Sequence, residues 1–256
     1  MAESGTTKKR VSKKNSEFPF LCENLSFAGK EAYKRLRTNL QFCFPDQENC
    51  GVVGITSAHP AEGKSLTSIN LCYSLAQLNK RVLLIDADMR RSSIASKLGL
   101  RAQPGMSNLL MDVNNAANVL QEYIPSDDSY GFFFLAAGDT PPNPSELLHS
   151  ARMSRLMEGL RTKFDYIVLD LPPVGAVSDA QTVSSLVDGM LIVVREDHTP
   201  KPMLEECIKQ LQLTNSRILG FVINGAVEGS SKSYSYGKYG KYGKYGSYGS
   251  YYKSYK

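Results

Sequence analysis

The chain has 256 residues, of which 42% are hydrophobic, and it carries a net charge of +5 at pH 7. This length suffices to bury one substantial core. No apolar run reaches the length of a membrane span, and the five cysteines form no C-x-x-C pair of the kind found in zinc and iron–sulfur sites. The cysteines are therefore expected to be reduced, in a soluble cytoplasmic protein.

Charge and composition divide the chain into three predicted segments. Residues 1–26 are expected to form a polar, basic N-terminal segment, and residues 27–228 a folded domain. Residues 229–256, called the tail below, contain six lysines and no acid. Because the basic excess belongs to the tail, the folded domain is close to neutral and is not expected to bind nucleic acid.

Short apolar runs alternate with amphipathic segments of helix length in the predicted domain. Such runs are typical of strands that are buried on both faces, so the pattern predicts an α/β fold with a doubly wound, mostly parallel sheet and helices on both faces. Ligands of such sheets bind beyond the carboxyl ends of the strands. The predicted strands are Val52–Thr56, Val82–Asp86, Phe132–Ala136, Tyr166–Asp170, Met190–Val194 and Leu219–Ile223. The predicted helices include Ser65–Leu78, Pro144–Leu160, Val177–Leu186 and Lys201–Leu213.

A phosphate-binding motif follows the first predicted strand, where residues 57–65 read S-A-H-P-A-E-G-K-S. Its place between a strand and a helix is typical of a P-loop, although Ala58 stands at the first glycine of the general pattern. We expect Lys64 to reach the β- and γ-phosphates of a nucleotide and the Ser65 hydroxyl to ligate Mg²⁺. An ordinary strand-to-helix turn is the alternative. The predicted ATP-binding residues are Ala61, Glu62, Gly63, Lys64, Ser65, Leu66 and Asn224, the last either as an adenine contact or as a turn residue.

Two more predicted strands end in carboxylates, which the P-loop NTPase type of fold would use. The second strand leads into Asp86-Ala87-Asp88, and the fourth ends at Asp170. Because an unpaired charge at the end of a buried strand is costly, these acids need partners. Mg²⁺ would supply a cation, and a substrate hydroxyl awaiting deprotonation would supply a proton. A helix cap and a surface acid are the alternative interpretation.

Tyrosines crowd the tail, in which no aliphatic residue offers them a core. The rings are thus available to water, to a partner or to an enzyme. The composition leaves two interpretations open: a substrate for tyrosine phosphorylation, or a low-complexity segment that adheres to nucleic acid or to other chains. The predicted phosphorylation sites are Tyr234, Tyr236, Tyr239, Tyr242, Tyr245, Tyr248, Tyr251, Tyr252 and Tyr255.

Taken together, the motifs resemble those of the bacterial tyrosine autokinases of capsule and exopolysaccharide synthesis. The likeness rests on S-x-x-P-x-E-G-K-S, D-A-D-x-R-R, D-x-P-P, the segment 138–148 and the tyrosine cluster. It implies a kinase that uses ATP and Mg²⁺ to phosphorylate its own tail and other protein tyrosines. In that family Asp86 would be the base, Lys64 would stabilise the transferred phosphoryl group, and Asp88 and Asp170 would hold Mg²⁺ with Ser65. The catalytic set is thus Asp86, Lys64 and Asp88, and two departures are Ala61 for glycine and Ser92 for proline.

The resemblance also implies partners. An E-x-x-R-x-x-R helix joins subunits of this family into a ring, and the matching residues are Glu31, Lys34 and Arg37, with lysine at the first arginine. An exposed helix with internal ion pairs is the alternative. A separate membrane protein is expected to activate the kinase and to recruit it to the inner face of the membrane. Phosphorylation of the tail between subunits is expected, because a long flexible segment can reach a neighbouring site.

The main rival is a partitioning or cell-division ATPase of the same superfamily. Those proteins carry a signature lysine five residues before the P-loop lysine, where this chain has His59. A non-catalytic adhesive protein would explain the tail but would leave the P-loop and the aspartates without a role. The sequence therefore favours the kinase.

Overall fold

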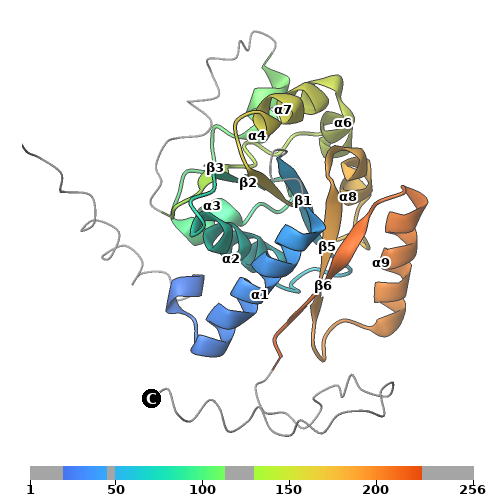
Figure 1. Cartoon of the computed structure of the whole chain (residues 1–256). Helices are drawn as coiled ribbons and strands as arrows, with labels where there is room; N and C mark the ends of the chain where they lie inside the picture. The colour runs from blue at the N-terminus through green and yellow to red at the C-terminus, as the bar shows by residue number, and fades with distance from the viewer. Residues whose placement is uncertain (1–19, 45–49, 113–129, 227–256) are drawn as a thin grey trace, which may run out of the picture. The chain divides into compact units, whose positions relative to one another are not determined.

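The computed structural model describes residues 20–44, 50–112 and 130–226 (Figure 1). At its centre is a six-stranded sheet in the order β3-β2-β4-β1-β5-β6, in which every pair is parallel. The predicted doubly wound α/β fold is confirmed, and each predicted strand lies within one residue of its observed bounds. The strands are β1 Gly51–Ser57, β2 Val82–Asp86, β3 Phe133–Leu135, β4 Tyr166–Asp170, β5 Gly189–Arg195 and β6 Ile218–Asn224.

Helices cover both faces of the sheet (Figure 1). One face carries α1 Phe27–Cys43, α2 Lys64–Ala76 and α3 Ile94–Leu98. The other carries α4 Met106–Met111, α6 Pro144–His149, α7 Ala151–Arg161, α8 Asp179–Thr182 and α9 Lys201–Leu213. Short 3₁₀ turns span Cys22–Asn24 (η2) and Ser184–Leu186 (η4).

The alternation of side chains along each strand builds one apolar core on each face. In β1, Val52 contributes to the core under α6 to α9, whereas Val53 and Ile55 contribute to the core under α1 to α3. Position 54 has room only for glycine, because a Cβ atom there would come within 2.4 Å of the Met190 sulfur. All seven residues of β1 are buried, as expected for a strand covered on both faces.

Two predicted helices differ from the structure. The single helix predicted over Pro144–Leu160 is wrong, because the chain breaks at Ser150, whose extended backbone ends α6 and whose side chain caps α7 by accepting a hydrogen bond from Met153 N. A serine favours such a cap over the helix interior. The segment predicted as a helix over Val177–Leu186 forms only the four-residue α8 and the turn η4, since its serine, threonine and valine residues are poor helix formers.

Packing begins before residue 27. Leu21 and Cys22, which composition places in the N-terminal segment, are buried in the core under α1 and α2. Asn70 of α2 donates a hydrogen bond to Phe20 O over 3.0 Å. The compact unit ends at Gly225, and the predicted tail lies outside the described residues. Within the described ranges, no helix combines the length and the apolar character needed to cross a bilayer.

Candidate active site

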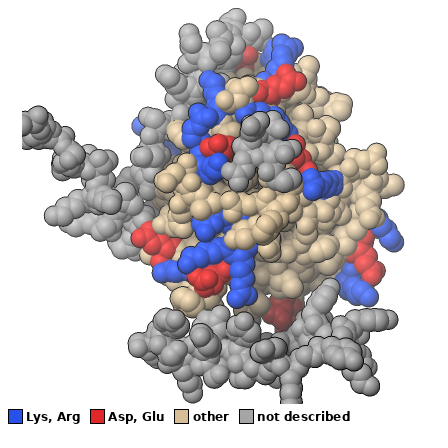
Figure 2. All heavy atoms as spheres, viewed as in Figure 1, with Lys and Arg blue, Asp and Glu red and all other residues tan. Residues whose placement is uncertain are grey.

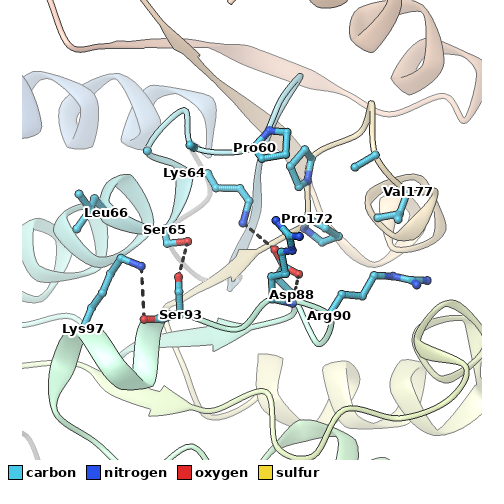
Figure 3. A pocket seen from close by; sticks show the side chains of 15 residues that line it. Pro60, Lys64, Ser65, Leu66, Asp88, Arg90, Ser93, Lys97, Pro172 and Val177 are labelled. Atoms are coloured by element: carbon cyan, nitrogen blue, oxygen red, sulfur yellow. Dashed lines mark hydrogen bonds and ion pairs between the residues drawn. The ribbon is translucent and has the colours of Figure 1, made fainter. Parts of the chain in front are cut away.

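The three predicted motifs meet at one edge of the sheet. β2, β4 and β1 are neighbours, and Asp86 of β2 lies opposite Asp170 of β4 in the register. Beyond these strand ends lies a pocket of about 680 Å³ (Figure 3). Its walls come from the P-loop, the segment after β2, α3 and the segment after β4; the lining residues are Pro60, Ala61, Gly63, Lys64, Ser65, Leu66, Asp88, Arg90, Arg91, Ser93, Lys97, Pro172, Pro173, Ala176 and Val177.

The P-loop has the backbone shape that a phosphate site requires. Ala61 and Gly63 both adopt positive φ angles, of 64° and 94°. A Cβ atom on Gly63 would meet Asn224 Nδ2 at 1.9 Å, so only glycine fits there. α2 begins at Lys64, so the free N–H groups of its first turn lie at the pocket. A helix N-terminus preceded by a glycine loop fits a phosphate group.

The Glu62 carboxylate supports the loop from behind. This side chain is fully buried, accepts a hydrogen bond from His59 N over 3.0 Å and accepts another from the Thr199 hydroxyl. Glu62 therefore belongs to the P-loop as predicted, but its side chain joins the loop to the segment between β5 and α9.

Asn224 also contacts the P-loop. Its Nδ2 donates to the Glu62 carbonyl over 2.9 Å, and its Oδ1 accepts from Gly225 N. Asn224 is not among the residues that line the pocket. In this structure it holds the loop in place, and the predicted adenine contact stays a prediction.

Lys64 links the P-loop to the two other motifs. Its ammonium lies 2.9 Å from Asp88 Oδ2 and 3.9 Å from Asp170 Oδ2. Burial by itself lowers the pKa of Lys64, but the charges of Asp170 and Asp88 outweigh burial, so the pKa is raised above its usual value. Lys64 is therefore a permanent cation, which suits a role in binding phosphate.

Asp86 is a buried carboxylate that is held by three backbone hydrogen bonds. It accepts hydrogen bonds from the backbone N–H groups of Asp88 (3.3 Å), Ser93 (3.3 Å) and Ile94 (3.2 Å). Burial, and next the charge of Asp170, raise the pKa of Asp86 to about 7 despite these bonds. A carboxylate with this pKa is well suited to accept a proton from a substrate.

Ser65, Asp88 and Asp170 are the predicted Mg²⁺ ligands. Ser65 and Asp88 line the pocket, whereas Asp170, which lies 3.9 Å from the Lys64 ammonium, is not among the lining residues. Asp170 Oδ1 accepts from the Ser68 hydroxyl over 3.0 Å, and burial raises the pKa of Asp170. In the described ranges no group of three or more His, Cys, Asp or Glu residues is arranged to hold a metal by itself. Mg²⁺ commonly binds through one or two carboxylates together with substrate phosphates and water, so the donor set present fits this ion.

An ion pair between Arg90, which lines the pocket, and the buried Asp179 was not anticipated from the sequence. Arg90 Nε donates to Asp179 Oδ2 over 2.8 Å, and its Nη2 donates to Ser145 Oγ over 3.1 Å. Asp179 is fully buried. The pair ties the segment after β2 to α6 and α8, and it gives Ser145 of the segment 138–148 a structural role. The residues are 55 and 89 positions apart from Arg90, so no local pattern could reveal the contact.

The predicted oligomerisation residues lie on α1. Lys34 Nζ forms an exposed ion pair with Glu31 over 2.6 Å, whereas Arg37 donates to Ser74 O of α2 over 2.8 Å. Arg37 is thus turned toward its own domain. Figure 2 shows acidic and basic side chains side by side over α1. The ring contact stays a prediction, and the nine tail tyrosines lie outside the described residues.

Known proteins with similar sequences and structures agree with this geometry. A family model described as an AAA domain matches residues 52–219. Tyrosine-protein kinase YwqD of Bacillus subtilis is 34% identical over 206 residues, which cover 80% of this chain and 85% of YwqD. The putative tyrosine-protein kinase EpsB of Ralstonia solanacearum is 39% identical over 81% of this chain, which spans 27% of EpsB. The solved kinase domain of Escherichia coli tyrosine kinase ETK has 34% identity and a TM-score of 0.72, covering 81% of this chain and 79% of that one.

By its fold and its P-loop, the domain is an AAA-type P-loop NTPase domain. The chain belongs to the bacterial tyrosine-protein kinases within that class. The predicted family, fold and enzyme class are thereby confirmed. The matches favour the kinase over the partitioning ATPase. Nucleotide binding follows from the family.

Proposed function

We propose that this chain is an ATP- and Mg²⁺-dependent protein-tyrosine kinase that phosphorylates its own tail and regulates the synthesis and export of an exopolysaccharide. The observation that carries the proposal is the convergence of Lys64, Asp86 and Asp170 beside the P-loop, at the carboxyl ends of β2 and β4. A phosphate site, a permanent cation and a carboxylate of near-neutral pKa are the parts that phosphoryl transfer to a hydroxyl needs.

Each part has a role in this proposal. The backbone of residues 61–66 would bind the phosphates of ATP, and Lys64 would stabilise the charge on the phosphoryl group in transfer. Ser65, Asp88 and Asp170 would hold Mg²⁺, which neutralises phosphate charge when bound. Asp86 would accept the proton of the tyrosine hydroxyl as the tyrosine oxygen bonds to the γ-phosphorus and ADP departs.

The tail would be modified between subunits of a ring-like homo-oligomer. Exposed charges of α1 at Glu31 and Lys34 support a subunit contact that uses this helix. A separate membrane protein would activate the kinase and recruit it from the cytoplasm to the inner face of the membrane. After phosphorylation the tails would repel one another, because each phosphotyrosine adds a charge of about −1.5 to −2.

The test is purified protein with Mg-ATP, probed for phosphotyrosine with and without residues 229–256. Phosphotyrosine on the full chain but not on the shortened chain supports the proposal. ATP hydrolysis without any phosphotyrosine would instead indicate a nucleotide-dependent switch of the partitioning type. To test transfer between subunits, a Lys64→Met chain with an intact tail is mixed with active enzyme that lacks the tail. An unlabelled Lys64→Met chain would contradict transfer in trans.

A further inference from the structure

The pocket is more basic than the motif residues account for. Among its 15 lining residues, four are cations and one, Asp88, is an acid. Lys64 is paired with Asp88, and Arg90 is paired with Asp179. The two other cations, Arg91 and Lys97, form no ion pair within the part of the chain that the structure describes. Arg91 is exposed to solvent, whereas Lys97 is half-buried.

Lys97 lies on the wall of the pocket that α3 contributes. It lies in the last turn of α3, and its ammonium is 3.5 Å from Ser93 O. The Ser93 hydroxyl in turn lies 3.3 Å from the Ser65 hydroxyl. Figure 3 shows the ammonium turned toward Ser65. Ser93 thus places Lys97 next to the P-loop serine and the first turn of α2, where the phosphates of a nucleotide bind.

The surroundings of Lys97 favour an anion as its ligand. Burial lowers the pKa of Lys97, and the charges of Asp170 and Asp86 only partly oppose this. A half-buried ammonium that bonds one backbone carbonyl retains donors to satisfy. An anion that enters the pocket would accept charge-assisted hydrogen bonds from these donors, which are stronger than bonds between neutral groups.

We propose that Lys97 is a second phosphate-binding lysine of the nucleotide site, which contacts the β- or γ-phosphate from α3. The inference rests on the proposed use of ATP and adds a residue outside the three motifs. In this arrangement Lys64 of the P-loop and Lys97 of α3 contact the phosphate chain from two walls of the pocket. Lysine acts on phosphate as a point charge, so an arginine at this position would retain most of the contact.

The experiment compares Lys97→Met and Lys97→Arg with Lys209→Met, a lysine exposed on α9 and far from the pocket lining. Binding of ATP, ADP, AMP and adenosine is measured by competition with a fluorescent ATP analogue in Mg²⁺. Loss of one charge-assisted phosphate contact should weaken ATP binding by about tenfold. AMP and adenosine should bind Lys97→Met as they bind the wild type, and Lys97→Arg should lie within about threefold of the wild type for ATP. Lys209→Met should match the wild type throughout.

Three results would overturn this inference. ATP affinity in Lys97→Met could equal that of the wild type. All four ligands could weaken equally together with a lower melting temperature, which would mark Lys97 as a structural support. Nucleotide affinity could be unchanged while KM for an acceptor tyrosine peptide rises, which would place Lys97 in the acceptor site. A wild-type chain that fails to bind ATP would instead refute the proposed function, and the two failures are thus distinguishable.

Discussion

The ammonium of Lys64 lies 2.9 Å from the carboxylate of Asp88, and both side chains are nearly buried. This contact joins the P-loop to the motif after β2. The same ammonium also lies 3.9 Å from Asp170 at the end of β4. A substitution that removes the charge of Lys64 therefore leaves Asp88 and Asp170 without this cation.

Replacing Lys64 by Met should lower autophosphorylation by about 100-fold or more, the usual effect of removing one group that stabilises transition-state charge. Without the charge of Lys64, the pKa of the buried Asp170 carboxyl would rise further, so the variant should lose stability mainly at high pH. Phosphotyrosine immunodetection measures the first effect, and circular dichroism melting at pH 6 and pH 8 measures the second. Near-native phosphotyrosine levels in this variant would refute the P-loop assignment.

The activity of the wild type should depend on the protonation of Asp86. Because the pKa of Asp86 is about 7, the rate should rise by about tenfold per unit below pH 7 and should level off above it. Asp86→Asn should lower the rate by about 100-fold or more at all pH values, since the amide cannot accept the proton. Initial rates between pH 5.5 and 8.5 test this, with nucleotide binding as the control. A rate that is independent of pH below 7 would exclude Asp86 as the base.

Stability should change in the opposite direction. The unfolded chain ionises this carboxyl near pH 3.9, whereas the folded chain keeps it protonated up to about pH 7. Stability is therefore lost as the pH rises from about 4 to 7, by up to about 4 kcal/mol for Asp86. Asp86→Asn should remove this loss of stability. Part of the gain is offset because the amide NH₂ of Asn would face the Asp88 N–H, which then has no acceptor. Urea unfolding at pH 4.5 and pH 8 should show Asn as stabilising only at pH 8.

The strained P-loop residue Ala61 offers a separate test. Its φ of 64° costs a residue with a Cβ atom about 1–2 kcal/mol of folding free energy. Glycine would avoid this cost, but it would destabilise the protein by about 0.4–1 kcal/mol because it gives the unfolded chain more conformational freedom. Ala61→Gly should therefore stabilise the protein by about 0.5–1 kcal/mol, or about 2 °C in melting temperature. ATP affinity should stay within about twofold, because the loop contributes backbone groups. A lower melting temperature would show that Ala61 is not strained.

Local sequence patterns predicted the strands and the motif positions because buried parallel strands are apolar along their whole length. They did not predict the break at Ser150, because apolar residues of one core lie on both sides of it, at Leu148 and at Met153, Met157 and Leu160. The extended backbone of Ser150 ends α6 and its side chain caps the start of α7, and neither feature is encoded in the apolar spacing.

Contacts between distant segments were the other part that the sequence could not supply. Glu62 was expected at the nucleotide through its place in the motif, yet its partner Thr199 is 137 residues away. Lys97 lies in a five-residue helix with no motif around it, and only the packing of α3 against α2 places it at the pocket. In each case the residue type was visible, but the neighbour was determined by the fold.

Two cations of α1 should separate assembly from folding. The exposed ion pair of Lys34 with Glu31 is worth at most about 0.5 kcal/mol, so Lys34→Ala should leave the melting temperature unchanged. Arg37 donates to Ser74 O in the last turn of α2, and its loss should cost about 1.5–3 kcal/mol, the usual worth of a hydrogen bond to a charged group. Light scattering of the unphosphorylated protein should show a smaller mass for Lys34→Ala at unchanged stability, and for Arg37→Ala both a smaller mass and a lower melting temperature. An unchanged mass in both variants would mean that the subunits assemble through a surface other than α1.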